Sequence, residues 1–514
     1  MARMCGVPRD DARQAMALLT NGSLSARDRK RRREQLTHRL RRVLGAHGLL
    51  VDDEALRPYE CDGLSAYRAV PLAVAMPHDV REVQAVLAAC RALALPVVAR
   101  GAGTGLSGGA LPHPDGVVLS LAKLNRVKRI DPQARLAVVE PGVRNLAISE
   151  AAKAYGLYYA PDPSSQIACS IGGNLAENSG GVHCLKYGLT VHNVAAATVV
   201  TMDGTLLEVG SEALDAPGYD LMALMTGSEG LLGVIVEITV KLLPIPERAQ
   251  VLLAAFDDVQ RAGDAVARII ADGIVPAGLE MMDRLAIGAA EDFVHAGYPT
   301  DAEAILLCEL DGSHAEVSEL ILKARTLLLD AGATQVRTAT DDAERALFWK
   351  GRKAAFPAVG RISPDYYCID GTIPRRELGT VLARIARLSA EYGLAVANVF
   401  HAGDGNLHPL ILYDANQPGA LEQTEALGAR ILELCVEVGG TITGEHGVGV
   451  EKIDQMCVQF GGAELAQFHA VKRAFDPVGL LNPGKAVPTL TRCAELGGMH
   501  VHGGKLPFPE LERF

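Results

Sequence analysis

Four side chains that can bind a metal or move a proton stand in two short glycine-rich segments. His401 and His408 enclose the run Ala-Gly-Asp-Gly-Asn-Leu, and Glu445 and His446 lie between two glycines. Two neutral imidazoles and a carboxylate can hold a divalent ion and leave positions open for a substrate. A histidine whose pKa lies near the working pH can also act as a general base. The residue types therefore indicate metal-assisted proton transfer.

A histidine pair also has a simpler interpretation, as buried rings satisfied by hydrogen bonds. Strand-like runs at 393–400 and 407–413 flank the Gly/Asp/Asn turn, so we expect a hairpin that brings His401 and His408 toward each other. The glycine-flanked setting favours approach by another group. Residue chemistry alone leaves both interpretations open. It also leaves open a non-haem iron oxygenase, because that class uses two histidines and a carboxylate.

A glycine-rich loop, GAGTGLSGGA at 101–110, follows a strand-like run and satisfies the pattern G-x-G-x-x-G. In nicotinamide-binding βαβ units these glycines open a helix, and an acidic residue stands about 20 positions on. Here two prolines follow in LPHPDG and the acidic residue is missing. We therefore expect that the loop binds a diphosphate through its backbone amides and that it does not belong to a nicotinamide-binding unit.

The elements that must position these segments are short strands and helices. Before residue 243, strands are expected at 72–76, 96–99, 116–121, 136–139, 195–201 and 231–241, and helices at 36–50, 79–93 and 145–155. The segment LPIPE (243–247) has two prolines and is typical of a linker. Beyond it, strands at 251–256, 304–311, 393–400 and 407–413 alternate with helices at 258–272, 315–331, 375–391 and 420–438. Two α+β units are therefore expected.

The composition is that of a globular protein with a large core: 514 residues, 49% hydrophobic and 22% charged. The net charge of −11 is uneven, because residues 1–42 hold twelve Lys or Arg against four Asp or Glu. An acidic body argues against nucleic acid as a partner. Residues 1–34 are expected to form a disordered basic extension.

No apolar run approaches the roughly 18 residues of a membrane helix. The first residues lack the apolar core of a secretory signal, so a cytoplasmic location is expected. The ten cysteines are scattered without a C-x-x-C pair, which gives no local zinc or iron–sulfur ligand set.

Three segments together resemble the vanillyl-alcohol-oxidase (PCMH) type of FAD-binding domain: PVVARGAGTGLSGGA (96–110), the Gly/Pro/Ser/Asn-rich run 161–181, and GSEGLLGVIVEITVKLLP (227–244). The resemblance implies that the first two hold the pyrophosphate of FAD and that the third lies along its adenosine part. No histidine stands in the first loop, where some members attach the flavin, so FAD is expected to be non-covalent. The cofactor-binding residues implied are Arg100, Gly101, Ala102, Gly103, Thr104, Gly105, Ser107, Gly108, Gly109, Pro161, Ser165, Gly172, Gly173, Asn174, Asn178, Gly180, Gly181, Gly230, Gly233, Ile235 and Asn482.

The runs HAGDGNLH and GEHG resemble the signature of the FAD-linked dehydrogenases of D-lactate, D-2-hydroxyglutarate and glycolate. The resemblance implies that a divalent metal (Zn, Mn or Fe) is bound by His401, His408 and Glu445. It further implies His446 as the base and Asn406 beside the substrate. The W-x-x-R segment 349–352 implies Arg352 as the partner of the substrate carboxylate, for which its planar fork is suited.

The expected substrate is a short 2-hydroxy acid. Phe356 and Cys368 stand where the hydroxyglutarate enzymes have a threonine and a lysine for a second carboxylate. YECDGLSAYR (59–68) and GRISPDYYCIDGTIPRR (360–376) are most similar to FAD-bearing subunits of bacterial glycolate oxidases. This implies oxidation of glycolate to glyoxylate by hydride transfer to FAD. Electrons would pass to a second FAD-type subunit, an iron–sulfur subunit and quinone, with peripheral attachment to the cytoplasmic face of the inner membrane through those partners.

The implied fold is α+β. It comprises a PCMH-type FAD-binding domain of two α+β subdomains over 35–245, a ferredoxin-like α+β cap or substrate domain over 246–485, and a tail over 486–514. Two further functions stay open beside the iron oxygenase: a D-lactate dehydrogenase acting alone, and a non-catalytic scaffold subunit. Retention of both histidines, Glu445, His446 and Arg352 speaks against a scaffold.

Overall fold

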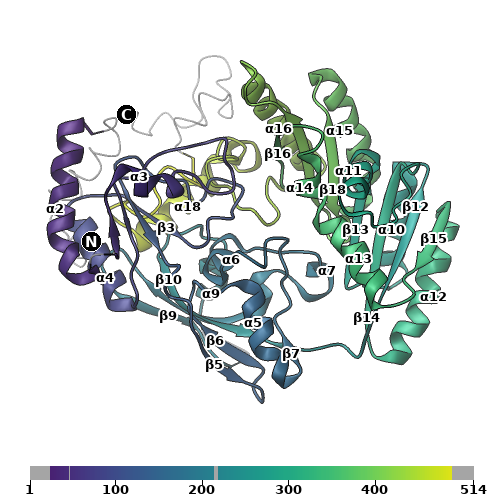
Figure 1. Ribbon diagram of the computed structural model, residues 1–514, viewed down its shortest axis with the longest axis horizontal. Coiled ribbons are helices and arrows are strands. Elements are labelled where there is room, and N and C mark those ends of the chain that lie inside the picture. Colours follow the sequence, from purple (N-terminus) through teal and green to yellow (C-terminus); the bar gives the residue numbers. More distant parts are fainter. Residues whose placement is uncertain (1–23, 46, 214–217, 489–514) are drawn as a thin grey trace.

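The computed structural model describes residues 24–45, 47–213 and 218–488. Two α+β units stand side by side in Figure 1: the first combines the N-terminal half with the C-terminal end of the chain, and the second is formed by the residues between. This confirms the α+β class predicted from the sequence. Within the described ranges, no helix is both long and apolar enough to cross a membrane.

The first unit begins with a small sheet that is mostly parallel. Its elements are β1 (Leu49–Leu50), β2 (Ala73–Ala75), the crossover helix α4 (Val80–Ala92), β3 (Val97–Arg100) and β4 (Val117–Ser120). The strands lie in the order β1-β2-β4-β3; β2 and β3 run parallel to β4, and β1 is antiparallel to β2. Because both faces of the parallel strands are buried, their residues form continuous apolar runs. The short helices α3 (Asp53–Leu56) and η1 (Arg57–Tyr59) follow β1.

Helix α2 (Ala26–Leu44) packs on α4. Its leucines 36, 40 and 44 recur at helical spacing and are buried in the core of this sheet. Asp115 anchors the start of the helix, because it accepts a hydrogen bond from the Leu24 N–H at 2.7 Å and pairs with Arg29 at 3.0 Å. Residues 24–34 are therefore ordered, which corrects the expected disordered extension over 1–34. Residues 1–23 lie outside the described part of the chain.

A second, antiparallel sheet completes the first unit. Its strands are β5 (Val127–Asp131), β6 (Leu136–Val139), β8 (Val194–Val200), β9 (Leu206–Gly210) and β10 (Val234–Lys241), in the order β5-β6-β10-β8-β9. The helices that accompany it are α5 (Asn145–Ala152), η2 (Lys153–Tyr155), α6 (Ile171–Glu177), α7 (Cys184–Tyr187), α8 (Thr190–Asn193) and α9 (Leu221–Met225). The 161–181 run is thus only partly irregular, since α6 lies within it.

The proline-rich segment at 243–247 joins the two units. Its first residues form β11 (Leu243–Pro244), which pairs with β7 (Leu157–Tyr158). The chain then enters the second unit at β12 (Arg248–Phe256).

The second unit is built on one antiparallel sheet in the order β15-β12-β14-β13-β18-β19-β16, with β17 paired to β19. The further strands are β13 (Gly278–Asp283), β14 (Ala304–Gly312), β15 (Gln335–Thr338), β16 (Asp365–Cys368), β17 (Gly371–Thr372), β18 (Val396–His401) and β19 (Asn406–Tyr413). Alternate residues of β12 enter different cores: Leu252 and Ala254 face one side, Val251 and Leu253 the other.

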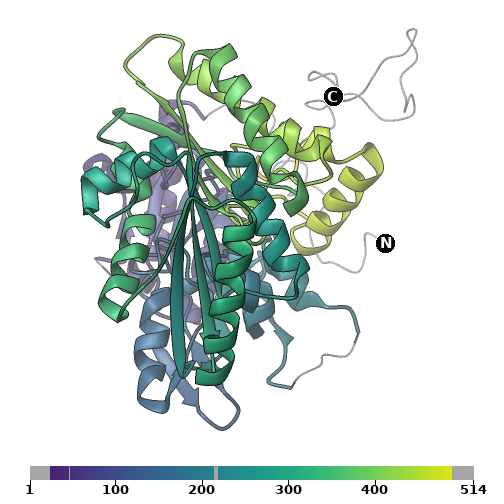
Figure 2. The same ribbon diagram turned by 90° about the vertical axis from the view of Figure 1, so that its right-hand side faces the viewer.

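Helices cover both faces of this sheet, as Figure 2 shows with the second unit toward the viewer. One face carries α10 (Val259–Ala271), α12 (His314–Asp330), α15 (Leu378–Tyr392) and α16 (Ala420–Glu437), with η3 (Arg375–Glu377) before α15. The other carries α11 (Arg284–Val294), α13 (Asp342–Lys353) and α14 (Ala355–Val359). The second face matters for the site, because α13 and α14 lie on it.

After the second sheet the chain returns to the first unit through α17 (Met456–Gln459) and α18 (Gly462–Phe475). Val471 and Phe475 of α18 join the core of the five-stranded sheet. Leu481 forms a parallel bridge with Val97. The last part of the predicted second domain, 246–485, therefore packs on the first unit. Of the expected tail 486–514, residues 489–514 lie outside the described ranges.

Candidate active site

The hairpin of β18 and β19 carries the two predicted histidine ligands. His401 ends β18 opposite Asn406, the first residue of β19, and His408 lies opposite Val399. Both histidines are buried, and their ring centroids are 5.0 Å apart. The predicted hairpin is confirmed, and it brings the two rings together.

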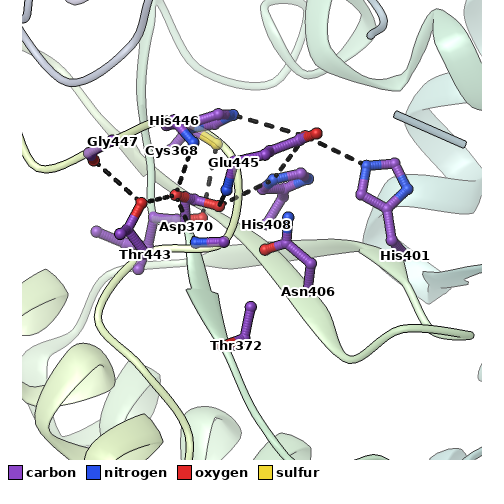
Figure 3. Close-up of polar contacts among 12 residues, drawn as sticks. Cys368, Asp370, Thr372, His401, Asn406, His408, Thr443, Glu445, His446 and Gly447 are labelled. Atoms are coloured by element: carbon purple, nitrogen blue, oxygen red, sulfur yellow. Dashed lines mark hydrogen bonds and ion pairs between the residues drawn. The ribbon is translucent and has the colours of Figure 1, made fainter. Parts of the chain in front are cut away.

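A buried carboxylate, Asp370, holds the loop that carries Glu445 and His446 (Figure 3). It accepts hydrogen bonds at 3.0–3.1 Å from the backbone N–H groups of Gly444, Glu445 and His446. The Lys452 ammonium lies 3.2 Å from its Oδ2. Burial raises the pKa of Asp370, but Lys452 and His446 outweigh it and hold the pKa well below its usual range. The charged form therefore persists and fixes the loop backbone.

Glu445 meets both hairpin histidines. Its Oε1 lies 3.4 Å from His401 Nε2 and 3.3 Å from His408 Nε2, and these three ligand atoms lie within 4.8 Å of one another. Burial raises the pKa of Glu445, but the neighbouring histidines lower it to about 2. His408 Nε2 is buried and finds no hydrogen-bond partner in the described ranges. Donor types, charge and the orphaned nitrogen all fit a divalent ion.

His446 lies beside this cluster. Its Nε2 is 3.9 Å from Glu445 Oε1, and its Nδ1 is buried without a hydrogen-bond partner among the residues described. Burial, helped by His408, lowers the pKa of His446 to about 4. The ring is therefore neutral near pH 7 and able to accept a proton.

Asn406 also reaches the loop, because a Cβ on Gly444 would come 2.4 Å from its Oδ1. That oxygen is buried and unpaired within the described part of the chain. The structure thus brings Asn406 beside the loop that carries Glu445 and His446, and glycine at 444 permits the approach.

The predicted substrate arginine, Arg352, lies on α13 and is only 1% exposed. Its Nη2 pairs at 2.5 Å with Oε2 of Glu280, a buried residue of β13. The other oxygen of Glu280 lies 2.8 Å from His401 Nδ1. Lys353, the next residue, lines the cavity described below, and Arg352 does not. Glu280, Asp370 and Lys353 were not predicted from the sequence.

A cavity of about 460 Å³ joins the two units at these residues. It ends at His408, Glu445 and His446, beside Lys353 and Phe356. The predicted cofactor-binding residues that line it are Arg100, Gly101, Ala102, Gly103, Thr104, Gly105, Gly109, Ser165, Gly172, Gly173, Asn174, Gly230, Gly233 and Ile235. Lining residues that were not predicted include Ser164, Cys169, Ser170, Glu177, Ser179, Glu229 and Pro357.

The glycine segments of this cavity fit a diphosphate. A Cβ at Gly101 would come 2.2 Å from Ser170 Oγ, and one at Gly172 would come 2.5 Å from Pro141 Cβ. Only glycine lets the backbone approach so closely, and exposed backbone amides are what a diphosphate needs. Burial and the neighbouring Glu229 raise the pKa of Glu177 well above its usual range, which favours a neutral carboxyl in the cavity wall.

Seven predicted cofactor-binding residues are not among the lining residues of this cavity as described: Ser107, Gly108, Pro161, Asn178, Gly180, Gly181 and Asn482. Some support its walls. The Asn482 side-chain amide donates to the carbonyls of Gly109 and Glu229. Gly180 lies against Glu445, because a Cβ there would come 2.6 Å from Oε2. Membership of a predicted cofactor-binding segment therefore does not by itself identify a residue that lines the cavity.

Comparisons with known proteins agree with this geometry. Residues 71–210 match the family described as "FAD binding domain", and residues 245–486 match "FAD linked oxidases, C-terminal domain". The chain is 67% identical to glycolate oxidase subunit GlcD of Escherichia coli strain K12 over 91% of this chain and 93% of that protein. The chain belongs to the FAD-linked oxidase family. This FAD-linked oxidase is thus an FAD-dependent oxidoreductase, as the sequence predicted.

More distant relatives include glycolate oxidase subunit GlcD of Bacillus subtilis, 39% identical over 83% of this chain and 91% of that protein. A D-lactate dehydrogenase of Anaerostipes hadrus is 32% identical over 85% and 94%. Identity therefore favours the glycolate oxidase subunits over the lactate enzymes, and membership of an FAD-linked family displaces the iron-oxygenase alternative.

Solved structures give the same fold. p-Cresol methylhydroxylase superposes on this FAD-linked oxidase with a TM-score of 0.76 at 17% identity, covering 91% of this chain and 98% of that one. The 4-ethylphenol oxidase of Gulosibacter chungangensis gives 0.75 at 19% identity, covering 91% and 99%. The predicted PCMH-type architecture is confirmed.

Proposed function

We propose that this chain oxidises glycolate to glyoxylate, using non-covalently bound FAD as electron acceptor. The proposal rests on one observation: a single cavity connects the glycine segments of the first unit to His408, Glu445 and His446 of the second. The 67% identity to a protein named as a glycolate oxidase subunit supports the choice of substrate.

His401, His408 and Glu445 would hold a divalent ion, which supplies Lewis-acid polarisation of a hydroxyl oxygen when bound. A second ligand group, Asp370 with His408 and His446, is also close enough. We prefer the first group because Asp370 already serves three backbone N–H groups and Lys452. FAD supplies the hydride acceptor when bound.

His446 is the proposed base for the substrate hydroxyl. Its lowered pKa keeps it neutral, so one of its ring nitrogens has a free lone pair that can accept the hydroxyl proton. Asn406, on the neighbouring strand, would orient the substrate through its amide. Asp370 keeps His446 in place through the backbone of the loop.

Two cations are candidates for the substrate carboxylate. Arg352 retains two nitrogens, Nε and Nη1, without hydrogen-bond partners among the described residues, although Glu280 holds its Nη2. Lys353 lines the cavity, and among the described residues its ion-pair partner is Asp162, at 3.5 Å. We propose that Lys353 contacts the substrate carboxylate. Arg352, which is buried beside Lys353 and outside the cavity lining, would contribute positive charge without contact.

The cavity favours a short substrate, because Phe356 lines it with its ring centroid 6.0 Å from that of His408. Cys368 is buried and offers no cation for a second carboxylate. The partners proposed are a second FAD-type subunit and an iron–sulfur subunit that pass electrons toward quinone. We propose a cytoplasmic location, peripheral on the inner membrane through those subunits.

The test is an anaerobic panel of 2-hydroxy acids added to the FAD-loaded protein while the flavin absorbance is followed. Glycolate should bleach the flavin fastest, ahead of D-lactate and far ahead of D-2-hydroxyglutarate. A preference for D-lactate in the absence of partner subunits would overturn the substrate assignment. In parallel, elemental analysis of His401→Ala should show loss of the metal that the unchanged protein retains.

A further inference from the structure

Glu280 lies in the middle of β13 and is 1% exposed. Its flanking residues Leu279 and Met281 enter one core of the second sheet, so Glu280 points to the opposite face, where α13 packs. A carboxylate buried in that position is costly unless it is paired and hydrogen-bonded.

Each oxygen of Glu280 has a different cationic or donating neighbour. Oε1 lies 2.8 Å from His401 Nδ1, and Oε2 lies 2.5 Å from Arg352 Nη2. Arg352 is itself 1% exposed, so the three side chains form one buried chain from α13 to the hairpin. Pairing of β13 with β18, with Met281 opposite Phe400, brings Glu280 beside His401.

This contact decides which nitrogen of His401 faces the cluster. An ionised carboxylate can only accept, so Nδ1 carries the proton. The other nitrogen, Nε2, is then the one left to offer a lone pair to a bound ion, and Glu445 Oε1 lies 3.4 Å from it. If Glu280 served only as the ion-pair partner of Arg352, its second contact, with the His401 imidazole, would have no role.

We propose that Glu280 is a positioning residue for metal binding: it fixes the orientation and tautomer of His401 and adds to the basicity of Nε2, while Arg352 balances its charge. The inference rests on the proposed function, in which His401 ligates the ion. Carboxylates that hold the far nitrogen of a ligating histidine typically change metal affinity by about 10- to 100-fold when they are lost.

Glu309 provides a matched control. It stands on the adjacent strand β14, is also 1% exposed, and also pairs with an arginine and a histidine: Arg345 Nε at 2.9 Å and His183 Nε2 at 3.4 Å. Glu309 is absent from both candidate metal-ligand groups found in the described ranges. Glu309→Gln therefore removes the same charge in a similar setting without touching the cluster.

The experiment uses the full-length, FAD-loaded protein, stripped with a chelator and titrated with Zn²⁺ or Mn²⁺ against a chromophoric competitor. Glu280→Gln should weaken metal binding at least about tenfold while the FAD content stays unchanged. Glu280→Asp should restore part of the affinity, and Glu309→Gln should bind metal as the unchanged protein does. Metal affinity of Glu280→Gln within about twofold of the unchanged protein would overturn the inference.

Glu280→Gln leaves the Arg352 charge buried and unbalanced, which can prevent folding. The double variant Glu280→Gln/Arg352→Gln restores neutrality and should show the same loss of metal affinity; normal affinity in it would overturn the inference. If the unchanged protein itself binds neither metal at the hairpin, the proposed metal site fails first, and the role of Glu280 fails with it. The two failures are thereby distinguishable.

Discussion

The imidazole rings of His408 and His446 lie stacked, with centroids 4.9 Å apart and planes 4° from parallel. One ring stands on the hairpin of the second unit, and the other on the loop held by Asp370. The stack therefore joins a proposed metal ligand to the proposed base at a fixed separation. Because His408 also helps burial to lower the pKa of His446, the same contact keeps the base unprotonated.

Replacing His446 by Asn should lower kcat for glycolate by roughly 100- to 10,000-fold, the usual contribution of a general base. FAD and metal content should stay normal, since the preferred metal-ligand group of His401, His408 and Glu445 does not include His446. Steady-state kinetics, flavin absorbance and elemental analysis measure these quantities. His78→Asn is the control, because His78 is half-exposed, stands just before helix α4 and is distant in sequence from His446. Turnover of His446→Asn close to normal would refute the base assignment.

Replacing Lys353 by Met should raise KM for glycolate by about tenfold or more, as expected for the loss of a charge-assisted hydrogen bond. The change in kcat should be smaller, because the lysine binds substrate and transition state alike. Lys350→Met is the matched control, since Lys350 is exposed on the same helix. An unchanged KM in Lys353→Met would instead indicate that Arg352 binds the substrate carboxylate.

Shortening Phe356 to Ala should enlarge the substrate end of the cavity. One methylene in an apolar pocket changes selectivity by about 10- to 200-fold, so the ratio of kcat/KM for D-lactate to that for glycolate should rise about tenfold. Competition assays with both acids measure the ratio. Phe293→Ala, at an exposed site on α11, should leave it unchanged. A ratio that does not move would mean that other residues limit substrate length.

The interface between the two units should be sensitive to pH at His183. Its Nδ1 lies 3.0 Å from Asp162 of the first unit and its Nε2 lies 3.4 Å from Glu309 of the second. Burial lowers the pKa of His183, but the two carboxylates outweigh it and raise the pKa to about 10. Since the folded pKa exceeds the ordinary value of 6.5, the stabilisation is complete below that value and is lost as pH rises through about 10.

His183→Gln should accordingly lower the free energy of unfolding by about 2 kcal/mol near neutral pH, with the deficit shrinking as the pH rises from about 6.5 to about 10. Urea unfolding curves of both proteins across this range give the comparison. His469→Gln serves as control, because within the described ranges the His469 ring pairs with the Pro488 carbonyl, away from any carboxylate pair of the interface. A deficit that is constant with pH would show that His183 is neutral in the folded protein.

The local part of the site could be predicted from sequence because it depends on short-range geometry. The hairpin that joins His401 to His408 needs only two strands and a glycine turn. The GEHG run stands a few residues after a helix, and its glycines signal close backbone approach. Several longer elements, such as β12, β14, α10 and α12, likewise follow from apolar periodicity.

The residues that were missed depend on contacts between distant segments. Asp370 reaches a loop more than 70 residues away, and Glu280 reaches His401 across a strand pairing. A signal for Glu280 does exist, since a lone carboxylate inside the apolar strand GLEMMD must be paired once it is buried. For α2, the helix expected from residue 36 in fact begins at Ala26, because the arginine-rich stretch before residue 36 was expected to belong to a disordered extension.

The most direct test of the account is the rate of flavin reduction by glycolate in anaerobic stopped flow, compared with glycolate deuterated at the carbon that bears the hydroxyl. The account predicts rapid bleaching with a primary isotope effect in the unchanged protein, and loss of bleaching in His446→Asn with FAD still bound. A flavin that stays oxidised with excess glycolate, in metal-replete protein, would contradict it.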